Sequence, residues 1–155
     1  MNQTQIEFVQ ALDRLRQVRL EALFPDVTNG EGHLLGNIGF LSKEKPAGPI
    51  RVSDLVQAAP VPAPAVSRSL KGLEAKQLIV READPKDRRN TLVRLTPLGR
   101  EKVAEHEEIL DRYFAGVEES FSTARYQKLV TEINELADVF AAELKRQIKG
   151  EEDSE

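Results

Sequence analysis

The sequence contains no cysteine. A chain without thiols forms no disulfide bond and offers no thiolate as a nucleophile or as a zinc ligand. It also has no run of eighteen consecutive apolar residues, so we expect no transmembrane helix and no membrane partner. Its first residues, MNQTQIEF, lack the basic start and apolar stretch of a secretory signal, which favours a cytoplasmic location.

Familiar catalytic motifs are missing as well. The sequence has no phosphate-binding P-loop, no G-x-G-x-x-G and no H-E-x-x-H. Neither of its two histidines stands in a serine–acid arrangement of the kind that supports nucleophilic catalysis. These absences argue against an enzyme and against a resident cofactor.

The chain has 155 residues, a length that suits one compact domain or one small domain with helical extensions. Charge is distributed unevenly along it. Residues 51–102 contain eleven Lys and Arg against six Asp and Glu, a local charge of +5. Because the formal net charge is −4, the remainder of the chain carries −9. A basic segment between acidic flanks is typical of a protein that presents one region to a polyanion.

The most informative segment is residues 84–99, DPKDRRNTLVRLTPLG. Residues 80–83 before it and 92–95 within it mix apolar and charged side chains, as half-buried strands do. Asp84, Pro85 and Asn90 supply turn chemistry between these strands. The pattern predicts a hairpin whose tip carries three cations, Lys86, Arg88 and Arg89.

Two short helices are predicted upstream of the hairpin. Ser53 is a good N-cap for the first helix, which carries Leu55 and Val56. Three prolines then break the chain before the second helix, which continues through Glu74. These prolines are Pro60, Pro62 and Pro64.

The second helix has two distinct faces. Val66, Leu70 and Leu73 follow the spacing of a buried stripe, which turns Ser67 and its neighbours Arg68 and Lys71 outward. Two helices followed by a basic hairpin is the order of a winged helix-turn-helix.

Three strings carry a family resemblance: VSDL, then AVSRSLKGLEAKQLIVRE, then DPKDRRNTLVRLTPLG. In this order and spacing the chain resembles the MarR family of transcriptional regulators, closely over residues 50–102. The resemblance implies a mainly α fold with a small β wing: a winged helix-turn-helix flanked by long N- and C-terminal dimerisation helices. We expect N-terminal helices at 1–45, the winged region at 46–99, C-terminal dimerisation helices at 100–149 and an acidic, disordered tail at 150–155.

Further elements follow from periodicity. We expect a long first helix over residues 4–24, ended by Pro25 and Asp26, and a second helix over 31–43. Residues 45–49 read as a loop, and 50–52 as a short strand that pairs with the hairpin to make a three-stranded wing. Two long helices follow, one after Gly99 and one after a cap at Ser122 and Thr123.

The terminal helices have larger apolar faces than one small winged domain can bury. The resemblance implies that the first and the last two helices interlock with a second copy of the chain as a homodimer. The alternative is that they wrap their own core. The residues expected at the dimer interface are Ile6, Val9, Leu12, Leu129, Ile133, Leu136, Phe140 and Leu144.

The second helix of the motif is expected to read bases in the major groove of double-stranded DNA. Arg68 can form a bidentate pair with a guanine, Ser67 can bond a base or a phosphate, and Ala65 can meet a thymine methyl group. Lys71 and Ser53 complete the expected contacts. An alternative for Arg68 is a phosphate contact or an internal ion pair with Glu74.

The wing tip is expected to enter the minor groove, where negative potential favours an inserted arginine. Arg89 is the first choice for this insertion. In the family an Asp-x-Arg motif places its arginine there while the aspartate holds the wing, and the motif maps onto Asp87, Arg88 and Arg89. Asp87 could also be an ordinary turn cap.

One position departs from the family. Pro62 and Ala63 stand where a serine or threonine often caps the recognition helix, which weakens capping by about 1 kcal/mol. Pro64 near the first turn compensates in part, because its missing N–H would have been unpaired there.

A dimer would bind a pseudo-palindromic operator. Repression by occlusion of the promoter is the default expectation, and activation is the alternative. The resemblance implies that a small aromatic or amphipathic effector releases the DNA when it enters a crevice between the helical dimer region and the winged domain.

Without cysteine, the thiol-based sensing of some relatives is excluded. Two alternatives stay open. One is a winged-helix protein-interaction module, and the other is a metal-responsive regulator that uses His33 and His106.

Overall fold

The structure, a computed structural model, describes residues 1–44, 50–59 and 61–152, with side chains described up to residue 148. The chain forms two units, Met1–Ile109 and Leu110–Glu155. Every helix in the described part of the chain is too short or too polar to span a lipid bilayer.

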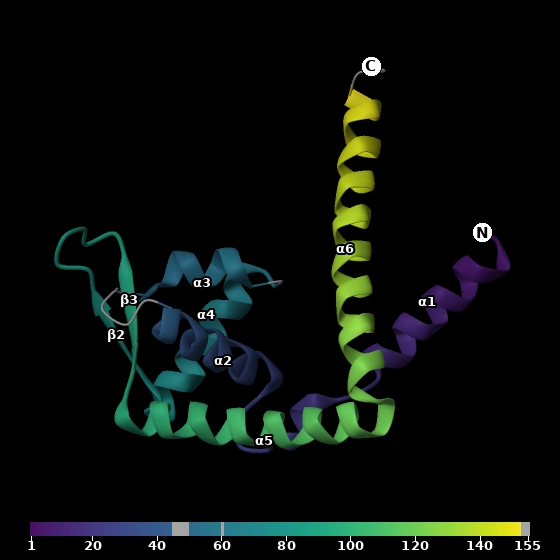
Figure 1. The fold of residues 1–155 in the computed structure, drawn as a ribbon. Helices are drawn as coiled ribbons and strands as arrows, with labels where there is room; N and C mark the ends of the chain where they lie inside the picture. The colour runs from purple at the N-terminus through teal and green to yellow at the C-terminus, as the bar shows by residue number, and fades with distance from the viewer. Residues whose placement is uncertain (45–49, 60, 153–155) are drawn as a thin grey trace. The chain divides into compact units, whose positions relative to one another are not determined.

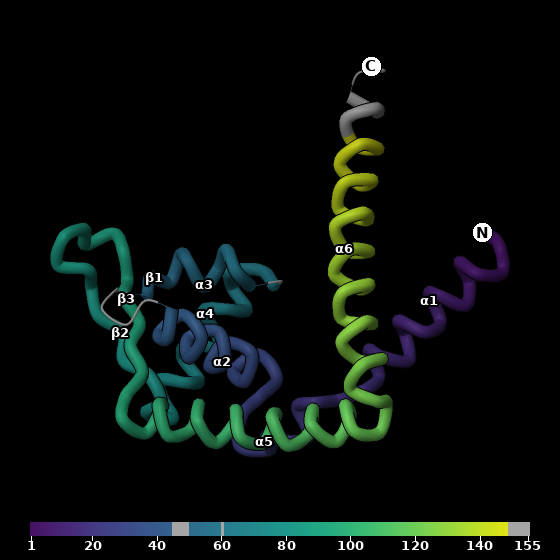
Figure 2. Tube along the Cα trace, in the orientation of Figure 1, coloured from purple at the N-terminus to yellow at the C-terminus, as the bar shows by residue number. Residues whose placement is uncertain are grey.

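The first unit is mostly helical and contains one small sheet (Figures 1 and 2). The expected combination of a mainly α fold with a small β wing is confirmed. Its elements in chain order are α1 (Gln3–Arg16), the 3-10 turn η1 (Leu20–Leu23), α2 (Asn29–Glu44), β1 (Ile50–Arg51), α3 (Val52–Ala58), α4 (Ala63–Ala75), β2 (Ile79–Ala83), β3 (Thr91–Leu95) and the start of α5 (Pro97–Phe121).

The core of this unit forms where α2, α3, α4 and the sheet meet. Burying an aliphatic side chain of this size contributes about 1.5–3 kcal/mol relative to leaving it in water. These residues therefore fix the positions of α3 and α4 against the sheet. The largest fully buried side chains are Leu35, Ile38, Leu55, Leu70, Leu73, Ile79 and Val93.

The sheet has three antiparallel strands in the order β1-β3-β2. Ile50 pairs with Val93, and the β2–β3 hairpin runs in register from Ile79 opposite Leu95 to Ala83 opposite Thr91. The predicted three-stranded wing is confirmed, with each hairpin strand one residue longer than the pattern indicated.

Two helices of this unit begin at polar caps that the periodicity alone did not indicate. The Thr28 hydroxyl accepts from the Glu31 N–H at 3.3 Å, and the Glu31 carboxylate accepts from the Thr28 N–H at 2.8 Å, so α2 starts at Asn29. The Thr96 hydroxyl accepts from the Gly99 N–H at 2.9 Å, and α5 therefore starts at Pro97, before Gly99.

The prediction of one continuous helix over residues 4–24 is wrong. α1 ends at Arg16, and a separate 3-10 turn covers Leu20–Leu23. No residue of α1 is buried, whereas Phe24 packs against the core. The chain must change direction to bring Phe24 there, and this packing overrides a periodicity that continues across the break.

The prediction that Ser53 caps α3 is also wrong. α3 starts one residue earlier, at Val52, and Arg51 occupies the capping position. The backbone N–H of Arg51 donates to the Asp54 carboxylate at 3.4 Å. Because Arg51 is the last residue of β1, the strand runs directly into the helix and leaves Ser53 exposed in the first turn.

The second unit contains the end of α5 and the whole of α6 (Thr123–Glu152). Ser122 joins the two helices with a left-handed φ of 76°, and its carbonyl accepts from the Tyr126 N–H at 2.9 Å. The Arg125 guanidinium lies 4.3 Å from the centre of the Phe121 ring. None of the α6 side chains that the structure describes is buried.

Two expectations concern residues that lie next to or outside the described ranges. The loop expected at 45–49 lies outside the described residues. The prediction that a disordered tail starts at residue 150 is wrong, because α6 continues to Glu152. Residues 153–155 lie outside the described residues.

Gly99 provides a direct test of how α5 joins the winged region. A Cβ at this position would lie 1.9 Å from the backbone oxygen of Leu78, which cannot move without disturbing β2. We expect Gly99→Ala to lower the free energy of unfolding by about 2 kcal/mol or more, measured by urea denaturation.

Gly36→Ala is the matched control, because no atom lies within 4 Å of a Cβ built at Gly36. Alanine favours a helix over glycine, so this variant should gain up to about 1 kcal/mol. Equal effects of the two substitutions would contradict the packing of α5 against Leu78.

Candidate nucleic-acid interface

Helix α4 presents a polar face away from the core. Ser67, Arg68 and Lys71 are exposed, while Val66, Leu70 and Leu73 on the other side are buried. Ala65 is half-buried at the first turn. The predicted division of this helix into a core face and an outward face is confirmed.

The start of α4 has the expected unusual cap. Pro62 precedes the helix without any side-chain hydrogen bond, and Pro64 occupies the first turn. The Pro62 carbonyl accepts from the Ala65 N–H at 2.9 Å. The helix therefore begins on proline geometry rather than on a polar cap, as the sequence indicated.

The end of α4 is fixed by backbone geometry. Gln77 has a left-handed φ of 59°, the Gln77 N–H donates to Glu74 O at 2.9 Å, and the Leu78 N–H donates to Leu73 O at 3.0 Å. This pair of bonds is a Schellman motif, with glutamine at a position that glycine usually occupies. The chain thereby turns directly from α4 into β2.

A partly buried ion pair ties α2 to the end of α4. Lys76 Nζ lies 2.6 Å from the Glu31 carboxylate, whose side chain is only 8% exposed. Burial opposes ionisation of Glu31, but hydrogen bonds from Lys76 and Thr28 outweigh it, so the pKa of Glu31 lies below its ordinary value. Gly72 leaves room for this carboxylate, because a Cβ there would lie 1.9 Å from its oxygen.

The alternative of an internal ion pair between Arg68 and Glu74 is wrong. Glu74 instead accepts hydrogen bonds from the guanidinium of Arg81 on β2, including one of 3.0 Å from Nε, and these bonds lower the pKa of Glu74. Arg81 thus holds the end of α4 to the sheet, while Arg68 is exposed.

Two aspartates shape the wing tip between β2 and β3. Asp84 is buried, accepts from the Lys86 N–H at 2.8 Å and lies 3.8 Å from Nε of Arg51 on β1. Asp87 accepts from the Arg89 N–H and the Asn90 side chain, each at 3.1 Å. Asp87 therefore caps the turn, as expected, and Asp84 anchors it to the sheet.

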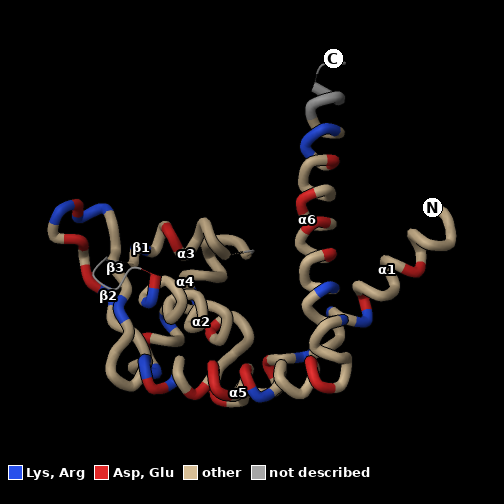
Figure 3. The backbone as a smooth tube through the Cα atoms, in the orientation of Figure 1, with Lys and Arg blue, Asp and Glu red and all other residues tan. Residues whose placement is uncertain are grey.

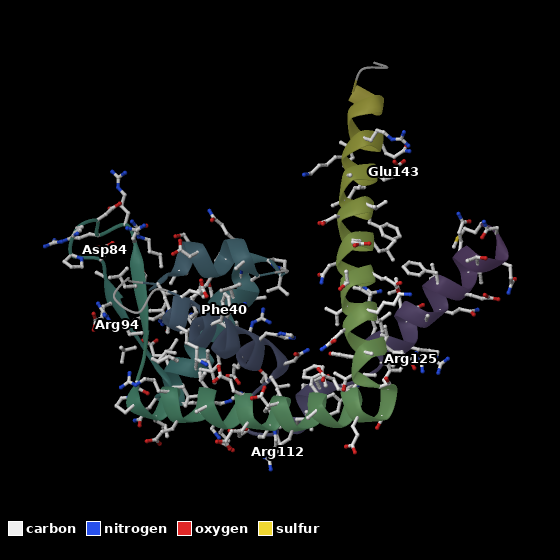
Figure 4. All side chains as sticks on the ribbon, viewed as in Figure 1. Phe40, Asp84, Arg94, Arg112, Arg125 and Glu143 are labelled. Atoms are coloured by element: carbon white, nitrogen blue, oxygen red, sulfur yellow. The ribbon has the colours of Figure 1, made fainter. Side chains whose placement is uncertain are left out.

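The role of Asp84 as an anchor was not predicted. The sequence indicated only its turn chemistry, because its partner Arg51 lies 33 positions earlier and reaches it only after β1 pairs with β3. Figure 4 labels Asp84 at the base of the wing tip and Arg94 further along the same hairpin.

Cations gather at the tip of this wing. Lys86, Arg88 and Arg89 are all exposed, and Figure 3 shows the tip of the hairpin mostly in blue. The residues expected on the helix and on the wing are thus brought to the surface of one unit, with Ser53 of α3 exposed as well.

The two histidines differ sharply in environment. His33 is exposed on α2, whereas His106 on α5 is 8% exposed and its ring centre lies 4.2 Å from that of Phe24. In the described ranges, no three His, Asp or Glu side chains gather as a metal site requires. This arrangement lends no support to the metal-responsive alternative.

These features define a winged helix-turn-helix protein. Residues 35–90 match the sequence model of the MarR family. The winged helix-turn-helix segment of the chain is therefore similar to the MarR family.

Relatives in Bacillus subtilis (strain 168) match the same part of the chain. Over 67 residues it is 40% identical to YdgJ and 39% identical to YxaD, both described as uncharacterized HTH-type transcriptional regulators. Each alignment covers 43% of this chain, and they cover 41% and 47% of the relatives, so the chain spans less than half of their length. Both descriptions name regulators rather than enzymes, in agreement with the sequence analysis.

Solved structures share the fold over most of the chain. A Staphylococcus aureus MepR–DNA complex matches with a TM-score of 0.67 and 21% identity, covering 90% of this chain and 99% of that one. MepR in a DNA-binding conformation matches with a TM-score of 0.63, also at 21% identity and the same coverage. At this level of identity the likeness concerns the fold.

His106 makes the stability of the fold depend on pH. Burial lowers the pKa of His106, and Asp26 opposes this effect only in part. The unfolded chain therefore binds more protons than the fold, so the contribution of His106 is present above its ordinary pKa of 6.5 and is lost as the pH falls below it.

We expect the urea midpoint of the parent protein to fall as the pH decreases from about 7 to about 5.5, and to fall less in His106→Leu. Leucine is suitable because His106 Nε2 is buried without a hydrogen-bond partner. His33→Leu, which removes an exposed histidine, should keep the parental slope. If His106→Leu kept it too, the account of His106 would be wrong.

Proposed function

We propose that this protein is a sequence-specific, DNA-binding transcriptional regulator that acts as a homodimer on a pseudo-palindromic operator. The observation that carries this proposal is the presence, on one folded unit, of an exposed cationic helix face and a cation-tipped wing. The charge of +5 on residues 51–102 supports a polyanionic partner, whereas the rest of the chain carries −9.

Helix α4 is suited to direct readout in the major groove. An α-helix fits that groove, and the residues near its N-terminal half reach base edges. Arg68 is exposed near the middle of α4 and can form a bidentate contact with a guanine. Ser67, Lys71 and Ala65 flank it and would supply further contacts to bases or phosphates.

The wing is suited to the minor groove. A narrow minor groove concentrates negative potential and favours an inserted arginine. The hydrogen bond from the Arg89 N–H to Asp87 holds the backbone of the tip, so Arg89 is our candidate for the insertion. Lys86 and Arg88 would lie beside it and contact phosphates.

Exposed apolar side chains support a homodimer. Large apolar patches are uncommon on monomers and often mark protein interfaces. We propose that a second copy of the chain covers those of α1 and α6. The proposed interface residues are each at least 38% exposed: Ile6, Val9, Leu12, Leu129, Ile133, Leu136, Phe140 and Leu144.

A dimer would present two copies of α4 to successive major-groove faces about 34 Å apart, so a twofold-symmetric operator follows. We further propose that the bound protein represses transcription by occluding the promoter and that a small aromatic or amphipathic effector releases it. MepR, whose solved structures share this fold, is a transcription regulator of the Staphylococcus aureus multidrug efflux pump MepA. Among the residues that the structure describes, no contact favours the alternative of a protein-interaction module.

The central test is DNA binding by the full-length protein. We expect Arg68→Ala and Arg89→Ala each to weaken binding to a fragment from upstream of the protein's own gene by about 1–3 kcal/mol, measured by fluorescence anisotropy. Arg16→Ala is the matched control, because it removes an exposed arginine from α1.

The salt dependence distinguishes DNA binding from protein contact. Phosphate contacts release counterions, so the affinity of the parent should fall steeply as salt increases. If both variants bound the fragment as tightly as the parent and the control, the assignment of Arg68 and Arg89 would be wrong.

Dimerisation is tested separately. Ile133→Glu places a charge on the apolar side of α6, and we expect it to shift the protein toward monomer at micromolar concentration in sedimentation equilibrium. Thr131→Glu is the control, because residue 131 lies about 200° around the helix from residue 133. A parent protein that is monomeric under these conditions would overturn the proposed homodimer.

A further inference from the structure

The outward side of α4 begins with an apolar residue. Residues spaced by four and then three positions lie on one side of a helix, so Pro64, Arg68 and Lys71 form a single stripe. All three are exposed. Ala63 and Ala65 stand on either side of Pro64 in the same turn. We call Ala63, Pro64 and Ala65 the apolar first turn.

The apolar first turn offers few hydrogen-bonding groups to a DNA phosphate. Pro64 has no N–H, and the Ala65 N–H already donates to the Pro62 carbonyl at 2.9 Å. Pro62 makes no side-chain hydrogen bond as the cap, and no side chain of residues 62–65 carries a polar atom. Helix starts that bind phosphate do so through free N–H groups. This turn is therefore poorly suited to a phosphate contact.

The major groove presents one group that matches such a surface. Adenine, guanine and cytosine show hydrogen-bond donors and acceptors there, whereas thymine also shows its 5-methyl group. A proline ring can neither donate nor accept a hydrogen bond, but it can remove a methyl group from water. An exposed proline on the outward stripe of α4 therefore favours a thymine over the other bases.

The rest of the stripe supplies the charge that brings this surface to DNA. Arg68 and Lys71 follow Pro64 on the same side of α4, and both are exposed. Arg68 lies four residues after Pro64, a rise of about 6 Å along the helix axis. Because base pairs are stacked about 3.4 Å apart, the bases that face these two residues lie within about two base pairs of each other.

We propose that Pro64 is a specificity-determining residue that packs against the 5-methyl group of a thymine in each half of the operator. This inference rests on the proposed function and adds to it the base that the first turn of α4 selects. The sequence had indicated only a helix-starting role for Pro64. Its substitution should change the preference for thymine, whereas phosphate contacts made elsewhere should stay the same.

The first test removes the methyl groups from the DNA. The fragment from upstream of the protein's own gene is amplified once with thymidine triphosphate and once with deoxyuridine triphosphate, because deoxyuridine pairs as thymine does but lacks the methyl group. Fluorescence anisotropy gives the affinity of the full-length protein for each fragment. The parent should bind the thymine fragment at least about fourfold more tightly, as expected for one methyl group removed from water.

A variant assigns this preference to Pro64. In Pro64→Ser the ratio of the two affinities should fall toward one, because a hydroxyl group replaces the apolar ring. Pro97→Ser is the matched control, since Pro97 is an exposed proline at the start of α5, and it should keep the parental ratio. Each ratio compares two fragments with one protein preparation, so a partial loss of folded protein cancels.

Single substitutions in the DNA give a readout that needs only the parent for the methyl effect. In a synthetic duplex of the protected site, thymines are replaced one at a time by deoxyuridine. The loss of affinity should be largest at a thymine within about two base pairs of the guanine whose replacement Arg68→Ala tolerates.

Three results would overturn the role of Pro64 while leaving the proposed function intact. These are DNA binding by the parent with equal affinity for both fragments, the same ratio in Pro64→Ser as in the parent, and single-site losses that are largest far from the guanine at Arg68. A parent protein that bound neither fragment would reject the proposed function, and this inference with it.

Discussion

The burial of one side of α4 against α2 and the sheet is the constraint on which the rest of the structure depends. Leu70 and Leu73 are buried there, and their burial determines which residues of the helix remain outside. Because residues two apart on a helix are rotated by about 200°, Arg68 lies opposite Leu70 and Lys71 lies opposite Leu73, and both face solvent while this packing holds. The candidate interface is therefore a consequence of the core.

Polar contacts add to the core packing in fixing the positions of α4 and the wing. The ion pair between Glu31 and Lys76 and the pair between Glu74 and Arg81 connect the last turn of α4 to α2 and β2. Asp84 fixes the base of the wing in a similar way through backbone and ionic contacts. The Glu31–Lys76 and Arg51–Asp84 pairs join groups distant in the sequence, so they hold helix and wing to one connected framework.

The sequence was sufficient where local patterns and tertiary packing agree. The stripe of α4, its proline start and the turn chemistry of the hairpin predicted elements that the structure contains. The sequence did not predict the features that depend on contacts between distant parts of the chain. The packing of Phe24 breaks the first helix, and the pairing of β1 with β3 makes Arg51 the cap of α3 in place of Ser53. The burial of Asp84 likewise depends on Arg51. The DNA contacts and the dimer interface are still predictions, because they involve partners that a single chain does not contain.

The central claim is that the outward face of α4 and the wing tip bind one duplex together. Amide chemical-shift mapping of the nitrogen-15-labelled protein, titrated with a short DNA duplex at low salt, tests it most directly. The account predicts that the largest shifts occur both on α4 between residues 65 and 71 and on the wing between residues 84 and 90. Shifts at only one of these places, or centred on α6, would contradict it.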